Sequence, residues 1–246
     1  MKRSTRTENE IIHGQVLAAR GAEDIWGWGS PAGRVRADRR AALIAEAAQL
    51  QPKNRVLEIG CGTGVFTERF AAFGCDIVAV DLSEDLLEIA RKRPLSATQV
   101  CFLCKPFEEC EIEGPFDAVV GSSILHHLDL QTALPKIFTL LKAGGRIAFA
   151  EPNMLNPQIC AQKNIPWLKR WLGDSPDETA FVRWALANTL RKVGFVEVRI
   201  SPFDWLHPLV PSLLIGVVSR VGRVFERIPV IREFSGSLLI FARKPS

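Results

Sequence analysis

A glycine-rich turn at residues 56–64, with the sequence VLEIGCGTG, constrains the fold of this chain more than any other stretch. A short apolar run enters three glycines separated by single residues, and phenylalanines at 66, 70 and 73 follow at helical spacing. The pattern predicts a buried strand, a tight turn and a helix. Glycine lets a ligand approach the backbone, and the N–H groups at the helix start can donate to that ligand. The sequence therefore predicts a nucleotide-type site at the head of an α/β sheet.

The spacing of the glycines distinguishes between nucleotides. A dinucleotide fingerprint, G-x-G-x-x-G, would need glycine at position 65, which is Val65. The observed order, E-x-G-x-G-x-G, resembles that of the class I S-adenosylmethionine (SAM) dependent methyltransferases. The alternative is a glycine-rich turn without a ligand. The resemblance implies that the following residues hold SAM: Glu58, Gly60, Cys61, Gly62, Thr63 and Gly64.

Predicted strands and helices alternate from residue 55 onward, which is typical of a parallel doubly wound sheet. The resemblance implies a Rossmann-like α/β fold with a sheet of seven strands, the last one antiparallel. Helices are expected at 64–73, from Glu84, and through about Leu141, where Gly144 and Gly145 would cap the helix. A capping box at 175–178 would begin a further helix that ends near Val193. The strands are predicted at 55–59, 77–80, 100–103, 116–121, 146–150, 195–200 and 237–242.

Four later segments follow in the order of the same family: 78–83, 116–128, 140–146 and 151–153. Asp81 ends the second predicted strand, where the family's carboxylate accepts the ribose hydroxyls of SAM. An acid at this position also occurs in NAD sites, so it supports an adenosine more than it supports SAM itself. The resemblance adds four residues to the expected SAM contacts: Asp81, Leu82, Phe107 and Ser122.

One position departs from the family pattern. The family often carries an aspartate after the third strand, where it accepts a hydrogen bond from the adenine amino group. Lys105 stands there in this chain, and lysine cannot accept that bond. We expect Phe107 to pack on the adenine, with a backbone carbonyl or Glu108 as the acceptor.

The candidate catalytic residues follow the fourth and fifth predicted strands. Methyl transfer from a sulfonium needs mainly in-line positioning, and a base helps when the acceptor is a hydroxyl. His126 and His127 lie at the carboxyl edge of the sheet, where open α/β sheets bind ligands. We expect one of them to act on the acceptor, His127 before His126, with Glu151 as a second candidate. The alternative is that the histidines only cap or pack the loop.

Residues 1–50 are predicted to form an N-terminal lid and helix, ahead of a methyltransferase domain at 51–246. Trp26 and Trp28 stand in a Gly/Pro-containing loop, which either covers the active site and contacts the acceptor or is only pinned to the core. Arg34, Arg36, Arg39 and Arg40 follow at the start of a helix. Most of them are expected on a solvated face, with Arg36 as the candidate to meet the carboxylate of SAM.

Two insertions, 153–175 and 207–234, are expected on the acceptor side. His207 begins the second and is a candidate acceptor contact. That insertion contains a basic amphipathic pattern, with Arg220, Arg223 and Arg227 on one face and aliphatic residues over much of the remainder. It is expected either to pack on its own domain or a second subunit, or to form a roof that helps the enzyme reach a lipid-like, membrane-held acceptor.

Composition narrows the partners. A net charge of +4 is too small to indicate nucleic acid, and no apolar run has the length needed to cross a bilayer. The six cysteines have no second pair spaced for zinc, so no metal is expected, and the polar, basic start predicts no signal peptide. We therefore expect a cytoplasmic monomer or homodimer, with peripheral membrane contact as an added hypothesis.

The sequence thus favours a SAM-dependent methyltransferase that acts on a small molecule, with a lipid-like molecule among the candidate acceptors, by O- or C-methylation. A non-catalytic SAM-fold binding or scaffold protein is the alternative from another class. An NAD-dependent oxidoreductase is disfavoured by Val65.

Overall fold

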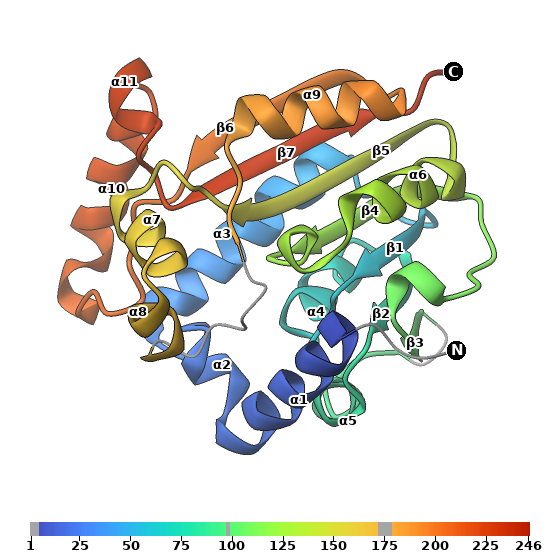
Figure 1. Ribbon diagram of the computed structural model, residues 1–246, viewed down its shortest axis with the longest axis horizontal. Coiled ribbons are helices and arrows are strands. Elements are labelled where there is room, and N and C mark those ends of the chain that lie inside the picture. Colours follow the sequence, from blue (N-terminus) through green and yellow to red (C-terminus); the bar gives the residue numbers. More distant parts are fainter. Residues whose placement is uncertain (1–4, 97–98, 172–178) are drawn as a thin grey trace.

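The computed structural model describes residues 5–96, 99–171 and 179–246 (Figure 1). Its centre is a seven-stranded sheet in the order β3-β2-β1-β4-β5-β7-β6. β7 pairs antiparallel with both β5 and β6, whereas the other pairs are parallel. The strands are β1 (Arg55–Ile59), β2 (Asp76–Asp81), β3 (Val100–Cys104), β4 (Phe116–Ser122), β5 (Leu141–Pro152), β6 (Val196–Phe203) and β7 (Ser237–Arg243). The predicted Rossmann-like sheet with an antiparallel last strand is confirmed.

Helices cover both faces of the sheet. One apolar cluster joins α3 (Pro31–Ala48), α4 (Val65–Ala71) and α5 (Glu84–Ala90) to one face. A second cluster joins α6 (Leu130–Leu140) and α9 (Arg183–Val193) to the opposite face. β1 is buried from Val56 to Ile59 because it lies centrally between these two layers. Both faces of such a strand are therefore buried, and its positions from Val56 to Ile59 are apolar apart from Glu58.

The expected cap of α6 is wrong. The helix ends at Leu140, close to the expected end at about Leu141, but Gly144 and Gly145 do not cap it, because β5 already begins at Leu141. Leu141 pairs with Phe116 of β4, and the register shifts before Ala118 pairs with Arg146. The two glycines therefore lie within the irregular start of β5. Tertiary pairing with β4 overrides the local glycine signal here.

The other helix boundaries follow local chemistry. The Ser83 side chain accepts from the Leu86 N–H and begins α5, and Gly194 ends α9 in the left-handed conformation. α9 itself begins at Arg183, and the capping box expected at 175–178 lies outside the described residues. α6 begins after Asp129, whose side chain accepts from the Gln131 N–H.

Most of the remaining elements gather at the end of the sheet where β1, β2, β4 and β5 finish, toward the left and bottom of Figure 1. They come from the N-terminal segment and from both insertions, whereas η1 and η2 follow β3 and β4. These elements are α1 (Thr5–Arg20), α2 (Ala22–Ile25), η1 (Phe107–Glu109), η2 (Leu125–His127), α7 (Pro157–Asn164), α8 (Pro166–Trp171), η3 (Ser212–Leu214), α10 (Ile215–Phe225) and α11 (Pro229–Arg232). Among the described residues, no helix is both long and apolar enough to cross a membrane.

Candidate cofactor and acceptor site

The glycine turn links β1 to α4 in a conformation that only glycine accommodates easily. Gly60 and Gly62 have φ of +68° and +52°. A Cβ on Gly60 would lie 2.4 Å from the Ile124 side chain, and one on Gly62 would lie 3.1 Å from the Trp26 ring. Left-handed backbone and close neighbours together explain why these positions lack side chains.

Asp81 fixes this turn from the end of β2. Its carboxylate accepts from the Gly62 N–H at 2.7 Å and from the Ser83 N–H at 2.9 Å. Burial raises the pKa of Asp81 above its ordinary value, while these backbone hydrogen bonds act in the opposite direction. The aspartate therefore positions the glycine turn as well as facing the ligand side.

Two cavities flank the turn, with volumes of about 390 Å³ and about 270 Å³. The larger is bordered by Thr63 and the tryptophan loop, and the smaller by Phe107. An extended ligand that lies across the turn would occupy both. Six residues border both cavities: Glu10, Gly60, Asp81, Leu82, Ile124 and His127.

Most of the predicted site residues come together around these cavities. Of the SAM contacts implied by the resemblance, Gly60, Cys61, Thr63, Asp81, Leu82 and Ser122 border the larger cavity, as do Trp26, Trp28, His126 and His127. Phe107 borders the smaller one. The predicted residues that border neither cavity are Glu58, Gly62, Gly64, Glu151 and His207.

Glu58 lies inside β1 with only 1% of its surface exposed. Burial raises its pKa to about 8, while the neighbouring Thr67 hydroxyl opposes the shift. Its carboxyl group is thus predominantly neutral at pH 7. The position of Glu58 suits support of the turn from beneath more than contact with a ligand.

The residue that departs from the family pattern, Lys105, lies at the smaller cavity. Lys105, Phe107 and Glu108 all border it. Phe107 is buried, and the Lys136 ammonium lies 5.0 Å from the centre of its ring. The same ammonium donates to the Phe107 carbonyl at 2.7 Å. A flat apolar surface and a carboxylate therefore stand where the adenine is expected.

Each histidine of the pair has its Nδ1 beside a carboxylate. His126 Nδ1 lies 2.6 Å from Glu151 Oε2, and both side chains are buried. Glu151 Oε1 also accepts from the N–H groups of Ile124 and Leu125, so it fixes the loop after β4. His127 Nδ1 lies 3.1 Å from Glu10 Oε2 of α1. His127 borders both cavities, whereas His126 borders only the larger.

The tryptophan loop is pinned to the core and also forms part of the wall of the larger cavity. The Trp28 ring packs edge-on against Phe66, with ring centres 5.4 Å apart. The guanidinium groups of Arg36 and Arg40 lie 5.2 Å and 5.3 Å from the centre of the same ring. Trp28 thus positions two cations at the larger cavity.

Arg40 is the residue that sequence reasoning missed. It is 3% exposed, borders the larger cavity, and donates from Nη1 to the Ser122 and Ser123 hydroxyls and from Nη2 to Ser237. Its Nε is buried without a hydrogen-bond partner among the described residues. Burial lowers the pKa of Arg40 to about 10, so it stays charged. Helical spacing from Gly33 and Ala37 would have placed it on the buried side of α3.

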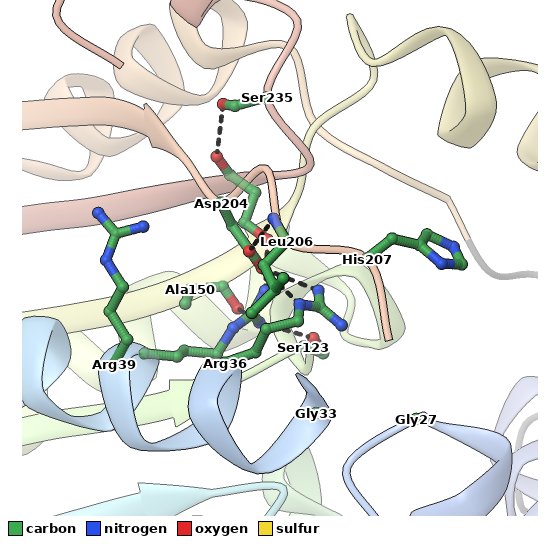
Figure 2. Close-up of polar contacts among 12 residues, drawn as sticks. Gly27, Gly33, Arg36, Arg39, Ser123, Ala150, Asp204, Leu206, His207 and Ser235 are labelled. Atoms are coloured by element: carbon green, nitrogen blue, oxygen red, sulfur yellow. Dashed lines mark hydrogen bonds and ion pairs between the residues drawn. The ribbon is translucent and has the colours of Figure 1, made fainter. Parts of the chain in front are cut away.

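Arg36, the residue expected to meet a carboxylate, already has one. Its Nη2 lies 2.8 Å from Asp204 Oδ2, and Figure 2 shows the two side chains together above α3. Arg36 still borders the larger cavity. His207 is directed away from this pair in Figure 2, and its Nε2 lies 3.2 Å from the Gln158 amide. The histidine therefore belongs to the contact between the two insertions.

The sheet order, the glycine turn and the paired cavities define the class of Rossmann-like methyltransferases, and comparison with known proteins agrees. A family described as "Methyltransferase domain" matches residues 56–145. A ubiquinone biosynthesis O-methyltransferase of Xanthomonas axonopodis pv. citri (strain 306) is 33% identical over 160 residues, which cover 62% of this chain and 67% of that protein. One from Bordetella avium (strain 197N) is 35% identical over 48% of this chain and 51% of that protein. The chain thus spans about half the length of several relatives that it matches.

A solved structure of the N-methyltransferase NodS from Bradyrhizobium japonicum WM9, in complex with S-adenosyl-L-homocysteine, shares the fold. Its TM-score is 0.62 at 19% identity, over 95% of this chain and 99% of that chain. The chain belongs to the class I SAM-dependent methyltransferases. It is a methyltransferase, and its cofactor is SAM.

Proposed function

We propose that the protein transfers a methyl group from SAM to a hydroxyl oxygen of a small, lipid-like acceptor. The observation that carries this proposal is the place of His127. It borders both cavities, and its Nδ1 lies 3.1 Å from Glu10. A base that accepts the acceptor's proton helps an O-methyl transfer, and His127 borders the larger cavity, where we propose that the acceptor lies beside the methionyl end of SAM.

The residues present fit SAM. We assign the adenosine end to the smaller cavity, beside Phe107, and the ribose hydroxyls to Asp81. The methionyl end is assigned to the larger cavity, where the buried Nε of Arg40 has no hydrogen-bond partner among the described residues. A guanidinium with such a group suits a carboxylate. SAM supplies a methyl group that is already activated on sulfur, so the chain's own residues mainly bind and orient.

We propose that His127 accepts the proton of the acceptor hydroxyl. Glu10 beside Nδ1 favours the tautomer that carries its proton there, which leaves Nε2 as the basic nitrogen. His126 is assigned a different role, because Glu151 and its backbone hydrogen bonds hold it within the loop after β4. Glu151 is then a positioning residue rather than a base.

The wall of the larger cavity supports an apolar acceptor. Ile25, Trp26, Trp28 and Ile159 border it beside the histidines. The names of the O-methyltransferase relatives support oxygen as the acceptor atom. C-methylation of an activated ring carbon is the second candidate, since it uses the same cavity and a base at the same place.

We further propose a cytoplasmic enzyme with peripheral membrane contact, active as a monomer or homodimer on a small molecule and not on nucleic acid. Residues 1–50 would act as lid and helix to the domain at 51–246. A lipid-like acceptor gives the enzyme a reason to visit a membrane surface.

Titration calorimetry with SAM, S-adenosylhomocysteine and NAD tests the cofactor half of this proposal. We expect SAM and S-adenosylhomocysteine to bind and NAD not to bind. Turnover is then measured with hydroxylated aromatic acceptors of increasing chain length, by release of S-adenosylhomocysteine. Tight SAM binding without transfer to any acceptor of this series would favour the non-catalytic SAM-fold alternative.

A further inference from the structure

Helix α10 has two sides of opposite character. Its inward side packs against the loop after β6: the Phe225 and Trp205 rings meet edge-on with centres 5.4 Å apart. Gly222 allows this approach, because a Cβ there would lie 2.9 Å from Trp205. The inward side alone therefore accounts for the packing of the helix, and the outward side needs another explanation.

The outward side carries a row of exposed aliphatic residues. Leu213 is 91% exposed, Val217 58%, Val221 44% and Val224 52%. These positions are spaced by four, four and three residues, so they form one stripe along η3 and α10. Figure 1 places α10 and α11 on the outer edge of the molecule. A contiguous exposed apolar stripe of this kind is unusual on a surface that contacts only water, and it indicates an interaction site.

A row of cations runs beside the stripe. Arg220, Arg223 and Arg227 are all exposed and are spaced by three and four residues. The only two acids between residues 205 and 246 are turned inward. Glu226 receives both guanidinium nitrogens of Arg39, at 2.7 Å and 2.5 Å, and Glu233 lies 2.8 Å from Arg183. Within residues 205–246, the outward side therefore combines aliphatic and cationic groups without a carboxylate.

We propose that this side of η3 and α10 is the surface by which the protein binds an acidic phospholipid bilayer. Aliphatic side chains that lie beside arginines match the boundary between acyl chains and anionic headgroups. A second copy of the chain is a poorer occupant, because it would bring the same arginines to the same patch. The inference rests on the peripheral contact proposed above and names the residues that make it.

The support of this surface links it to the cavity. Arg39 holds Glu226 from α3, and Arg36, on the same helix, pairs with Asp204 while bordering the larger cavity. Glu226 also accepts from the Asp204 N–H at 2.9 Å. A bilayer bound to α10 therefore has a fixed orientation relative to the acceptor cavity.

Vesicle co-sedimentation of the full chain tests the proposal. We expect binding to phosphatidylcholine vesicles that contain phosphatidylglycerol, and much weaker binding to phosphatidylcholine alone. Each arginine near an acidic surface is worth about fivefold in affinity, so R220E/R223E/R227E is expected to lose at least about 100-fold. The variant L213Q/V217T/V221T replaces three aliphatic side chains by polar ones of similar size. Its affinity for acidic vesicles is expected to fall about tenfold or more, because it removes apolar contact without changing charge.

A matched control separates local from overall charge. K92E/R191E/K192E alters three exposed residues on other elements and changes the formal net charge from +4 to −2, as the α10 set does. It should lose less than about threefold, since charges beyond about 10 Å from the surface are screened. Circular dichroism and thermal melting confirm that each variant is folded.

Three results would overturn the proposal: no binding of the wild-type chain to acidic vesicles, equal loss in the control and α10 sets, or a solution dimer that L213Q/V217T/V221T dissociates. Vesicle binding is measured without acceptor. A chain that binds vesicles but transfers no methyl group refutes the proposed reaction alone. An active enzyme that does not bind vesicles refutes the surface and the peripheral membrane contact, but not the proposed reaction.

Discussion

The cofactor side and the acceptor side of this enzyme differ in how their residues are brought together. Around the glycine turn, Gly60 and Gly62 follow β1 and Asp81 ends β2, and these two strands are adjacent in both sequence and sheet. Around the part of the larger cavity proposed for the acceptor, Glu10 and Lys163 come from helices more than 150 residues apart. The first region is dictated by backbone geometry, the second by the packing of distant segments. Substitutions in the two regions should therefore fail in different ways.

The largest effect is expected on the cofactor side. Gly60→Ala puts a Cβ at positive φ, 2.4 Å from Ile124, so the turn must move. We expect SAM affinity to fall by more than about 100-fold in calorimetry, because left-handed strain and the clash both act on the binding loop. Gly216→Ala is the matched control, since nothing lies within 4 Å of its Cβ and it sits at the start of α10. Equal SAM affinity in both variants would remove the geometric argument for the turn.

The histidine pair should separate catalysis from stability. His127→Asn is expected to lower kcat by about 100-fold with SAM affinity within a few-fold of wild type, as for loss of a general base. His126→Asn removes the partner of the buried Glu151 and should lower stability by about 1–3 kcal/mol. Steady-state kinetics and thermal melting on both variants make the comparison. The assignment is reversed if His126→Asn alone loses turnover while it melts as wild type.

Arg40 can be tested by the group that it is proposed to hold. Arg40→Lys keeps the charge but loses the planar guanidinium, so affinity for S-adenosylhomocysteine should fall by about tenfold. Affinity for 5′-methylthioadenosine, which lacks the amino-acid group, should not change. Arg39→Lys serves as control, because Arg39 faces Glu226 instead. An equal loss for both ligands in Arg40→Lys would mean that the arginine only supports the loops around it.

The same contrast explains what the sequence could predict. The alternation of strands and helices, the glycine turn and Asp81 follow from residues close in the chain, and the structure bears out the seven-stranded sheet that the alternation and the family resemblance imply. Gly144 and Gly145 were misplaced because pairing between β4 and β5 outweighs a local helix-stop signal. Arg40 was missed because four arginines stand close together, and only the buried side of α3 shows which one turns inward. The sequence could not show which aliphatic residues of α10 are packed and which are exposed, because the packed side is defined by Trp205, which lies outside the helix.

The smallest expected effect concerns Glu58, which lies under the turn. Its pKa is raised to about 8 in the folded chain, from an ordinary value of 4.5, because burial disfavours the charged form. The unfolded chain thus ionises first, and the stability contributed by the neutral carboxyl is lost as pH rises from about 4.5 through 8. Glu58→Gln removes this titrating group. Between pH 5 and 8.5 its Tm should therefore fall by roughly 5 °C less than the Tm of the wild type. The exposed Glu88→Gln should keep the wild-type slope. The same dependence of Tm on pH in the wild type, Glu58→Gln and Glu88→Gln would mean that Glu58 contacts water in the folded chain. Asp81 alone would then support the glycine turn.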